Sequence, residues 1–201
     1  MSITVLDKEA MVDGVNYLSS LNANLSKFLK SYNVPTLPVE KNYFWALCRS
    51  VIYQQISGKA AKKISDRYLS LYANGERMLP SEVIDIDIKK IFKVGISRQK
   101  ASYIKNIAHA FNTKIIDEKN ISKLDDQEII SQLTTIKGVG RWTAEMFLIF
   151  TLRRSDVFPV TDLGVQKGFR IFYSLDDLPT IELMNKKSES WKPYRTIMSL
   201  Y

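Results

Sequence analysis

The chain has 201 residues, 45% of them hydrophobic, which is enough for one domain or for two small lobes with a real core. Its 29 lysines and arginines against 21 acidic residues give a formal charge of +8, which suits a polyanion such as nucleic acid, although an ordinary solvated surface can carry the same charge. A single cysteine, Cys48, excludes an internal disulfide and any metal or iron–sulfur site built from four cysteines.

Helical periodicity dominates the first half of the chain. Apolar residues recur at helical spacing between residues 7 and 32, and prolines then break the pattern before a helix that begins near Tyr43. One face of this helix carries Phe44, Leu47, Cys48, Val51 and Ile52. Gly58 interrupts the pattern, and another helix follows it. Residues 74–82 are expected to form a loop, and Ile3–Leu6 is the one segment that resembles a strand.

Helix start and stop signals divide the second half. Residues 87–92 predict a short helix that ends at Gly95, and Ser97 is typical of an N-cap for the helix that follows. Asp125 and Glu128 fit the acidic form of a capping box. The helix that they open stops at the turn formed by Gly138, Val139 and Gly140.

The remainder of the chain also indicates helices. A nearly apolar run from Thr143 predicts a buried helix, and residues 153–162 then form a loop. Residues 163–173 look helical, a turn is expected at residues 182–185, and residues 191–201 predict a final, partly aromatic helix. The sequence therefore predicts an all-α protein.

The glycine turn between two helices is a candidate anion site. Backbone N–H groups around Val139 and Gly140 stand at the start of a helix, where the helix dipole adds partial positive charge. Lys137 directly precedes Gly138, and Arg141 directly follows Gly140, so two cations flank the turn. This arrangement suits one backbone phosphate, gripped without reading bases. Many helical hairpins, however, use glycine only to turn.

A longer string carries a more specific signal. The segment IKGVGRWTA, residues 136–144, resembles the hairpin of the helix-hairpin-helix (HhH-GPD) DNA glycosylases of base-excision repair. Four more segments between Tyr43 and Tyr201 match this superfamily in order: residues 52–64, 94–108, 156–169 and 191–201. The branch that the chain resembles is the 3-methyladenine DNA glycosylase II family.

This resemblance implies two helical lobes around a DNA-binding cleft, within a single helix-hairpin-helix domain that spans residues 1–201. We expect one lobe at about residues 43–123, which carries the residue that fills the gap left by a flipped base. The other lobe, at about residues 124–201 together with residues 1–42, would carry the hairpin and the catalytic aspartate.

Asp162 is the candidate catalytic residue. The family places an essential aspartate about twenty residues after the hairpin, at the start of a helix, and Asp162 matches it. A carboxylate near the sugar stabilises the positive charge of an oxocarbenium-like transition state and can orient or deprotonate water. Aspartate at this position is also a common N-cap, and Asp156 is a rival carboxylate in the charged part of the same loop.

The resemblance also implies residues that contact the substrate. Gln55, with Gln54 beside it, matches the segment that fills the gap after base flipping, although glutamines at a helix end can simply be solvated. The candidates for the base pocket are Trp142, Met146, Tyr43 and Trp45, each of which could instead belong to a core. Further candidates for phosphate contacts are Arg98, Lys100, Lys62, Lys63 and Lys167.

The resemblance also indicates which reaction to expect. Family members that nick the strand carry a lysine where this chain has Trp142, so we expect a monofunctional enzyme that hydrolyses the N-glycosidic bond of alkylated purines in duplex DNA. Alternatives are a non-catalytic helix-hairpin-helix DNA-binding module and a glycosylase for oxidised or deaminated bases.

Cofactor, partner and location follow from the same comparison. We expect no cofactor and no metal ligands, while the resemblance allows a monovalent cation between the hairpin and a phosphate. Damaged double-stranded DNA is the expected partner of a monomer. No apolar run approaches the ~20 residues of a membrane span, and no secretion signal is visible. An intracellular protein, in the cytoplasm with the nucleoid or in a nucleus, is therefore expected.

Overall fold

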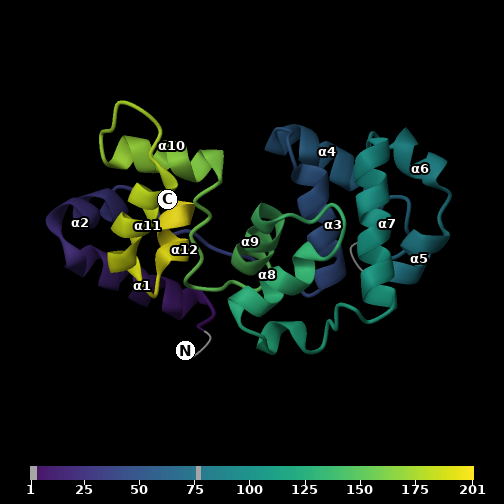
Figure 1. Ribbon diagram of the computed structural model, residues 1–201, viewed down its shortest axis with the longest axis horizontal. Coiled ribbons are helices and arrows are strands. Elements are labelled where there is room, and N and C mark those ends of the chain that lie inside the picture. The colour runs from purple at the N-terminus through teal and green to yellow at the C-terminus, as the bar shows by residue number, and fades with distance from the viewer. Residues whose placement is uncertain (1–3, 76–77) are drawn as a thin grey trace. The chain divides into compact units, whose positions relative to one another are not determined.

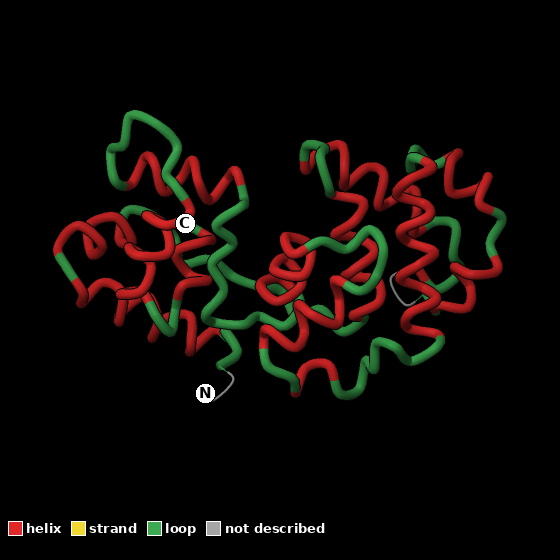
Figure 2. The backbone as a smooth tube through the Cα atoms, in the orientation of Figure 1, coloured by secondary structure: helices red, strands yellow, loops and turns green. Residues whose placement is uncertain are grey.

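The computed structural model describes residues 4–75 and 78–201 and is helical almost throughout (Figure 2). Within these ranges the β pairing is a single bridge between Val5 and Arg154, so the predicted all-α class is confirmed, and Ile3 of the expected strand lies outside the described residues. The chain forms two compact units. The central unit is Glu40–Phe147, and the terminal unit joins the described residues up to Val39 to Leu148–Tyr201.

The central unit is built on the 15-residue helix α7 (Arg98–Asn112), which packs against α3 (Tyr43–Tyr53) and α5 (Pro80–Asp85) (Figure 1). Its other helices are α4 (Gly58–Leu69), α6 (Ile88–Lys93), α8 (Asp126–Thr134) and the 3-10 helix η2 (Ile121–Lys123). Helix α9 (Arg141–Phe150) begins in this unit and leads into the terminal one. The predicted apolar face of α3 is fully buried: Phe44, Leu47, Cys48, Val51 and Ile52 are each at most 1% exposed.

Two predicted caps fix helix starts in the central unit. The hydroxyl oxygen of Ser97 accepts the N–H of Lys100 over 3.3 Å at the start of α7. Asp125 and Glu128 form the predicted capping box, because each backbone N–H donates to the other carboxylate, over 2.9 and 2.8 Å. Each such cap typically stabilises a helix by about 1 kcal/mol.

The terminal unit brings both ends of the chain together. Its helices are α1 (Lys8–Leu21), α2 (Ala23–Lys30), α10 (Leu163–Phe172), α11 (Ile181–Ser188), the 3-10 helix η3 (Glu189–Trp191) and α12 (Arg195–Leu200). Helix α1 contacts α12, and Gly14 lies so close to Ile197 and Tyr194 that a Cβ there would overlap both side chains. Leu18, Leu25 and other apolar residues of α1 and α2 share one core with Phe169 and Trp191 of the C-terminal segment.

Several helix boundaries differ from the sequence prediction. The helical run after residue 7 is broken at Asn22, whose side-chain oxygen accepts the N–H of Leu25 over 2.9 Å and so starts a second helix. The turn expected at residues 182–185 is part of α11, and the final helix begins at Arg195. In the expected loop of residues 74–82, Glu76 and Arg77 lie outside the described residues, and its last residues already belong to α5.

The predicted assignment of the hairpin to a lobe with residues 124–201 is wrong. The hairpin belongs to the central unit. Its backbone is held there by α7 and by the end of α3: the amide group of Asn106 donates to the carbonyl of Lys137 over 3.0 Å, and the amide of Gln54 donates to the carbonyl of Gly138 over 3.3 Å. A lobe boundary near residue 124 assumes that segments adjacent in the sequence pack together. The contacts of the hairpin instead join residues 31 and 84 positions apart.

Candidate functional site

The two glycines of the hairpin have different roles. Gly138 has a φ of +106°, which disfavours any residue with a side chain, and a Cβ on it would overlap the ring of Tyr103. Gly140 is exposed, is not among the positive-φ glycines, and a Cβ on it would meet nothing within 4 Å. Gly138 therefore shapes the turn, while Gly140 keeps the surface in front of α9 open.

The backbone N–H of Val139, which the sequence suggested as a phosphate donor, is engaged within the turn. This N–H donates to the carbonyl of Ile136 over 2.9 Å, and the side chain of Val139 is 4% exposed, so it is part of the core under the turn. The N–H groups at the start of α9 cannot be satisfied within the helix. The N–H groups of Gly140 and of the start of α9 therefore remain the candidates for binding an anion.

Two cations flank this helix start, as predicted. Lys137 is exposed just before Gly138, and Arg141 is the first residue of α9. The Nε of Arg141 lies 2.9 Å from Oε1 of Glu145, whose side chain is only 5% exposed. The Glu145 carboxylate orients the guanidinium of Arg141. The sequence indicates this pair only through the i,i+4 spacing of the two residues.

The two glutamines after α3 face different surroundings. The Nε2 of Gln54 donates to the carbonyl of Gly138 and, over 2.9 Å, to the hydroxyl of Thr143, so this side chain joins α3 to the hairpin. Gln55 is exposed and has a φ of +57°, an uncommon left-handed conformation for a residue other than glycine. Such backbone outliers concentrate at functional sites. Gln55 is therefore exposed, whereas Gln54 is half-buried and bound to the hairpin.

A groove of the central unit joins these features. It has a volume of about 460 Å³. It is lined by both glutamines, by Gln99, Lys100 and Tyr103 of α7, and by residues 136–140 of the hairpin, among others. The hairpin and the loop that carries Gln55 therefore share one open surface within this unit.

Asp162 is the N-cap of α10 in the terminal unit. Its Oδ1 accepts the N–H of Val165 over 3.0 Å, and the residue is half-buried. The turn before it is fixed, because the N–H of Asp162 donates to the carbonyl of Pro159 over 2.9 Å, and the amide of Gln166 donates to Val160 over 2.9 Å. The carboxylate is therefore held at the partly exposed start of a helix.

The rival carboxylate has a structural partner. Asp156 pairs with Arg195, with Oδ1 at 2.7 Å from Nε and Oδ2 at 2.9 Å from Nη2. This two-pronged pair is about a quarter exposed on each side and ties the loop after α9 to the start of α12. Asp156 therefore serves the fold of the terminal unit.

The residues predicted for the base pocket separate into two groups. Trp142, Met146 and Tyr43 are half-buried, with Trp142 and Met146 one turn apart on α9. The ring of Tyr43 meets that of Phe147 edge-on at 5.8 Å. Trp45 is 1% exposed and stacks on Tyr68 with ring centroids 6.0 Å apart, so its prediction as a substrate contact is wrong. The helix period of α3 turns Trp45 into the core while Tyr43 stays at the surface.

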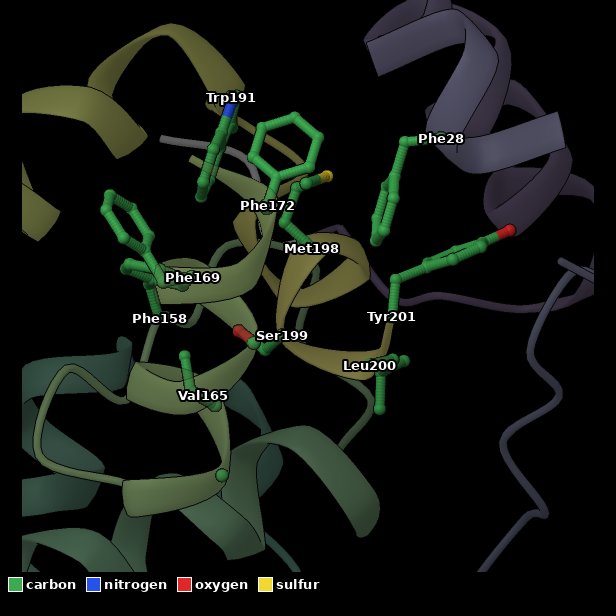
Figure 3. Close-up of a pocket in the computed structure, with 12 residues that line it drawn as sticks. Phe28, Phe158, Val165, Phe169, Phe172, Trp191, Met198, Ser199, Leu200 and Tyr201 are labelled. Atoms are coloured by element: carbon green, nitrogen blue, oxygen red, sulfur yellow. The ribbon is translucent and has the colours of Figure 1, made fainter. Parts of the chain in front are cut away.

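The terminal unit contains an aromatic cavity of about 200 Å³ beside α10 (Figure 3). Figure 3 shows the rings of Phe28, Phe158, Phe169, Phe172, Trp191 and Tyr201 around it, with Met198 between them. Gly164, two residues after Asp162, also lines it. No pattern in the sequence indicates this cavity, because its walls come from segments at opposite ends of the chain.

Residues 48–193 match the family described as HhH-GPD superfamily base excision DNA repair protein. The chain belongs to this superfamily. Over 100% of its length, this HhH-GPD chain is 35% identical to DNA-3-methyladenine glycosylase 1 of Schizosaccharomyces pombe, of which it covers 92%. It is 32% identical to DNA-3-methyladenine glycosylase of Saccharomyces cerevisiae, where the match covers 88% of the chain and 70% of the relative.

Solved structures show the same fold. The S. pombe 3-methyladenine DNA glycosylase Mag1, in complex with abasic DNA, superposes on this HhH-GPD chain with a TM-score of 0.88 and 36% identity, over 94% of each chain. The DNA-3-methyladenine glycosidase of Bacillus halodurans gives a TM-score of 0.82 and 29% identity, over 100% of this chain and 90% of the other. The predicted membership of the glycosylase superfamily is therefore confirmed.

Two further features concern membrane spans and metal ions. Within residues 4–75 and 78–201, no helix is both long and apolar enough to cross a bilayer. In the same ranges, no cluster of three histidine, cysteine or acidic side chains is arranged to hold a metal ion.

Proposed function

We propose that this protein is a monofunctional DNA glycosylase that hydrolyses the N-glycosidic bond of alkylated purines of the 3-methyladenine type in duplex DNA. The relatives' names support this substrate class. The observation that carries the proposal is the position of Asp162, whose carboxylate caps the N-terminus of α10 at a partly exposed site. The rival Asp156 pairs with Arg195.

The reaction needs a nucleotide turned out of the base stack. Gly140 and the first turn of α9, with Lys137 and Arg141, hold one backbone phosphate, and a monovalent cation can share this site. Gln55 enters the gap that the base leaves. Gln54 does not enter the stack, since its side chain binds the hairpin.

Bond cleavage depends on one carboxylate. Asp162 stabilises the positive charge that develops on the deoxyribose, and it orients or deprotonates the attacking water. An N-alkylated purine such as 3-methyladenine is already cationic, so it leaves without a protein acid and is attracted to aromatic faces. Trp142, Met146 and Tyr43 are the side chains that we assign to the base.

The enzyme leaves an abasic site. In relatives that also nick the strand, a lysine forms a Schiff base with the sugar at the position of Trp142, which cannot do so. We place the protein as a monomer in the compartment that holds the cell's DNA.

The decisive experiment compares Asp162→Asn with Asp156→Asn. Single-turnover release of 3-methyladenine from methylated duplex should fall by roughly a thousandfold or more in Asp162→Asn, as for loss of a principal charge-stabilising group, while binding to damaged duplex is kept or improved. Asp156→Asn should lower stability and retain the rate. Unchanged base release in Asp162→Asn would instead indicate a non-catalytic DNA-binding module.

A panel of duplexes defines the substrate class. The panel contains 3-methyladenine, 7-methylguanine, 1-methyladenine, hypoxanthine and 8-oxoguanine. We expect release of the alkylated purines. Release of only hypoxanthine and 8-oxoguanine would replace the proposal with a glycosylase for deaminated or oxidised bases.

A further inference from the structure

A lysine ammonium group holds the backbone immediately before Gln55. Lys100 extends from the first turn of α7, and its Nζ donates to the carbonyl oxygens of Ile52 and Gln54 over 2.8 and 2.6 Å. These carbonyls lie at the C-terminal end of α3, where the last C=O groups lack intrahelical donors and the helix dipole favours a cation. Lys100 therefore closes the end of α3 from a neighbouring helix.

This contact differs from the phosphate contact that the sequence suggested for Lys100. Burial lowers the pKa of its ammonium group, which has exchanged part of its hydration for the two carbonyls. An ammonium group has three N–H donors, and two of them are directed into the protein here. A desolvated charge is stable only where such hydrogen bonds replace water. The geometry is that of a structural clamp.

The clamp acts on a strained segment. Gln55 has a left-handed backbone, which costs free energy in a residue with a side chain and persists only where the surroundings impose it. The residue before it is held twice, because Lys100 binds the carbonyl of Gln54 while Gly138 and Thr143 bind its side-chain amide. Gln55 is the next residue, and it is exposed.

We propose that Lys100 is a positioning residue for nucleotide extrusion, because it fixes the backbone from which Gln55 projects into the base stack. This inference rests on the glycosylase function proposed above. Without the hydrogen bonds from Lys100, the loop that carries Gln55 becomes ordered only when Gln55 inserts into the base stack. The loss of conformational entropy at that step raises the barrier to nucleotide extrusion. Lys100 contributes nothing to the chemistry at the sugar.

The same helix offers a matched control. Lys105, five residues further along α7, donates from Nζ to the carbonyls of Ile84 and Ile86 over 2.7 and 2.8 Å. Burial lowers its pKa as well. It therefore closes the end of α5 with the same chemistry but does not touch the loop of Gln55. Any general effect of removing a buried ammonium from α7 should appear equally in Lys105→Met.

The activity experiment uses Lys100→Met, Lys100→Arg and Lys105→Met. With saturating enzyme, we expect single-turnover base release to fall about tenfold in Lys100→Met, to be largely restored in Lys100→Arg, and to stay near wild type in Lys105→Met. The slope of binding affinity against salt concentration should be unchanged, since no phosphate contact is lost. Gln55→Ala should remove the effect: Lys100→Met added to Gln55→Ala should give no further loss.

A second readout does not require base release. A duplex with a tetrahydrofuran abasic analogue beside 2-aminopurine reports insertion into the gap through fluorescence, and hydrogen exchange at Ile56 reports the order of the loop. Both should change in Lys100→Met and not in Lys105→Met. These measurements test the clamp even if the wild-type protein releases no alkylated base, an outcome that would defeat only the proposed enzymatic function.

Three results would overturn the clamp. The first is equal loss of rate and of insertion in the two methionine variants. The second is a multiplicative loss when Lys100→Met is combined with Gln55→Ala. The third is a shallower salt dependence in Lys100→Met, which would make Lys100 a phosphate contact after all.

Discussion

Gly138 packs directly on the ring of Tyr103, with no room for a Cβ between them. The phenol group of Tyr103 in turn accepts a hydrogen bond from the amide of Gln99 over 2.7 Å. The hairpin is therefore seated on α7, the helix that also carries Lys100. One helix thus supports both the phosphate-binding turn and the loop of Gln55.

The two hairpin glycines should respond differently to alanine. Gly138→Ala should lower the free energy of unfolding by about 2–4 kcal/mol, because it adds both an unfavourable φ and an overlap with Tyr103. Gly140→Ala should change stability by less than about 0.5 kcal/mol. It should weaken duplex binding roughly tenfold, because the added methyl group occupies the open space that the phosphate must enter and so weakens its hydrogen bond to the backbone N–H. Urea unfolding and fluorescence anisotropy measure the two effects; equal stability losses would contradict this reading.

Two glycines of α10 form a second matched pair. A Cβ on Gly164 would stand 3.0 Å from Oδ1 of Asp162, whereas a Cβ on Gly168 would meet nothing within 4 Å. Gly164→Ala should shift the carboxylate and reduce kcat roughly tenfold to a hundredfold. Gly168→Ala should raise the free energy of unfolding by about 0.5–1 kcal/mol through helix propensity.

Measuring kcat and the free energy of unfolding of Gly164→Ala and Gly168→Ala tests both expectations. A Gly164→Ala enzyme with wild-type kcat would show that the carboxylate tolerates the added methyl group.

Asp156 and Arg195 should matter for stability alone. The pair makes two charge-assisted hydrogen bonds, each typically contributing about 1.5–3 kcal/mol when one partner is removed. Because asparagine keeps one oxygen acceptor, Asp156→Asn should lose one of these bonds and lower the unfolding free energy by about 1–3 kcal/mol, and a double-mutant cycle with Arg195→Met should show coupling. Denaturant titration gives both values. Additive effects would mean that the two side chains do not interact in solution.

Buried tyrosines should make the central unit sensitive to alkali. Burial raises the pKa of Tyr72 from 10.0 to about 12 and raises that of Tyr68 as well, and the two hydroxyls lie 2.9 Å apart. The unfolded chain then loses protons at lower pH than the folded one. The stability that Tyr72 contributes is complete below pH 10.0 and is lost between pH 10.0 and about 12, and Tyr68 acts in the same direction.

Urea unfolding across this pH window tests the expectation. Tyr72→Phe should make the fall in stability less steep, whereas an unchanged slope would mean that other groups dominate the alkaline response.

The sequence predicted the local structure and the identity of the chemistry-bearing segments. The caps at Ser97 and Asp125 involve residues three positions apart, so they can be predicted from the local sequence. The start of α10 just after Asp162 follows from the same local chemistry. Periodicity identified the buried face of α3 but not the role of each member, and Trp45 was misplaced because its burial depends on Tyr68 of α4.

By itself, the sequence determined the all-α class, the superfamily and the short string around the hairpin, because helix caps, glycine turns and hydrophobic period are encoded within a few neighbouring residues. Only the tertiary structure decided that the hairpin belongs with α3 and α7, that Asp156 is held by Arg195, and that Lys100 faces the carbonyl of Gln54. These outcomes depend on contacts between residues 31 to 84 positions apart, which are set by the packing of the whole chain and not by any local pattern.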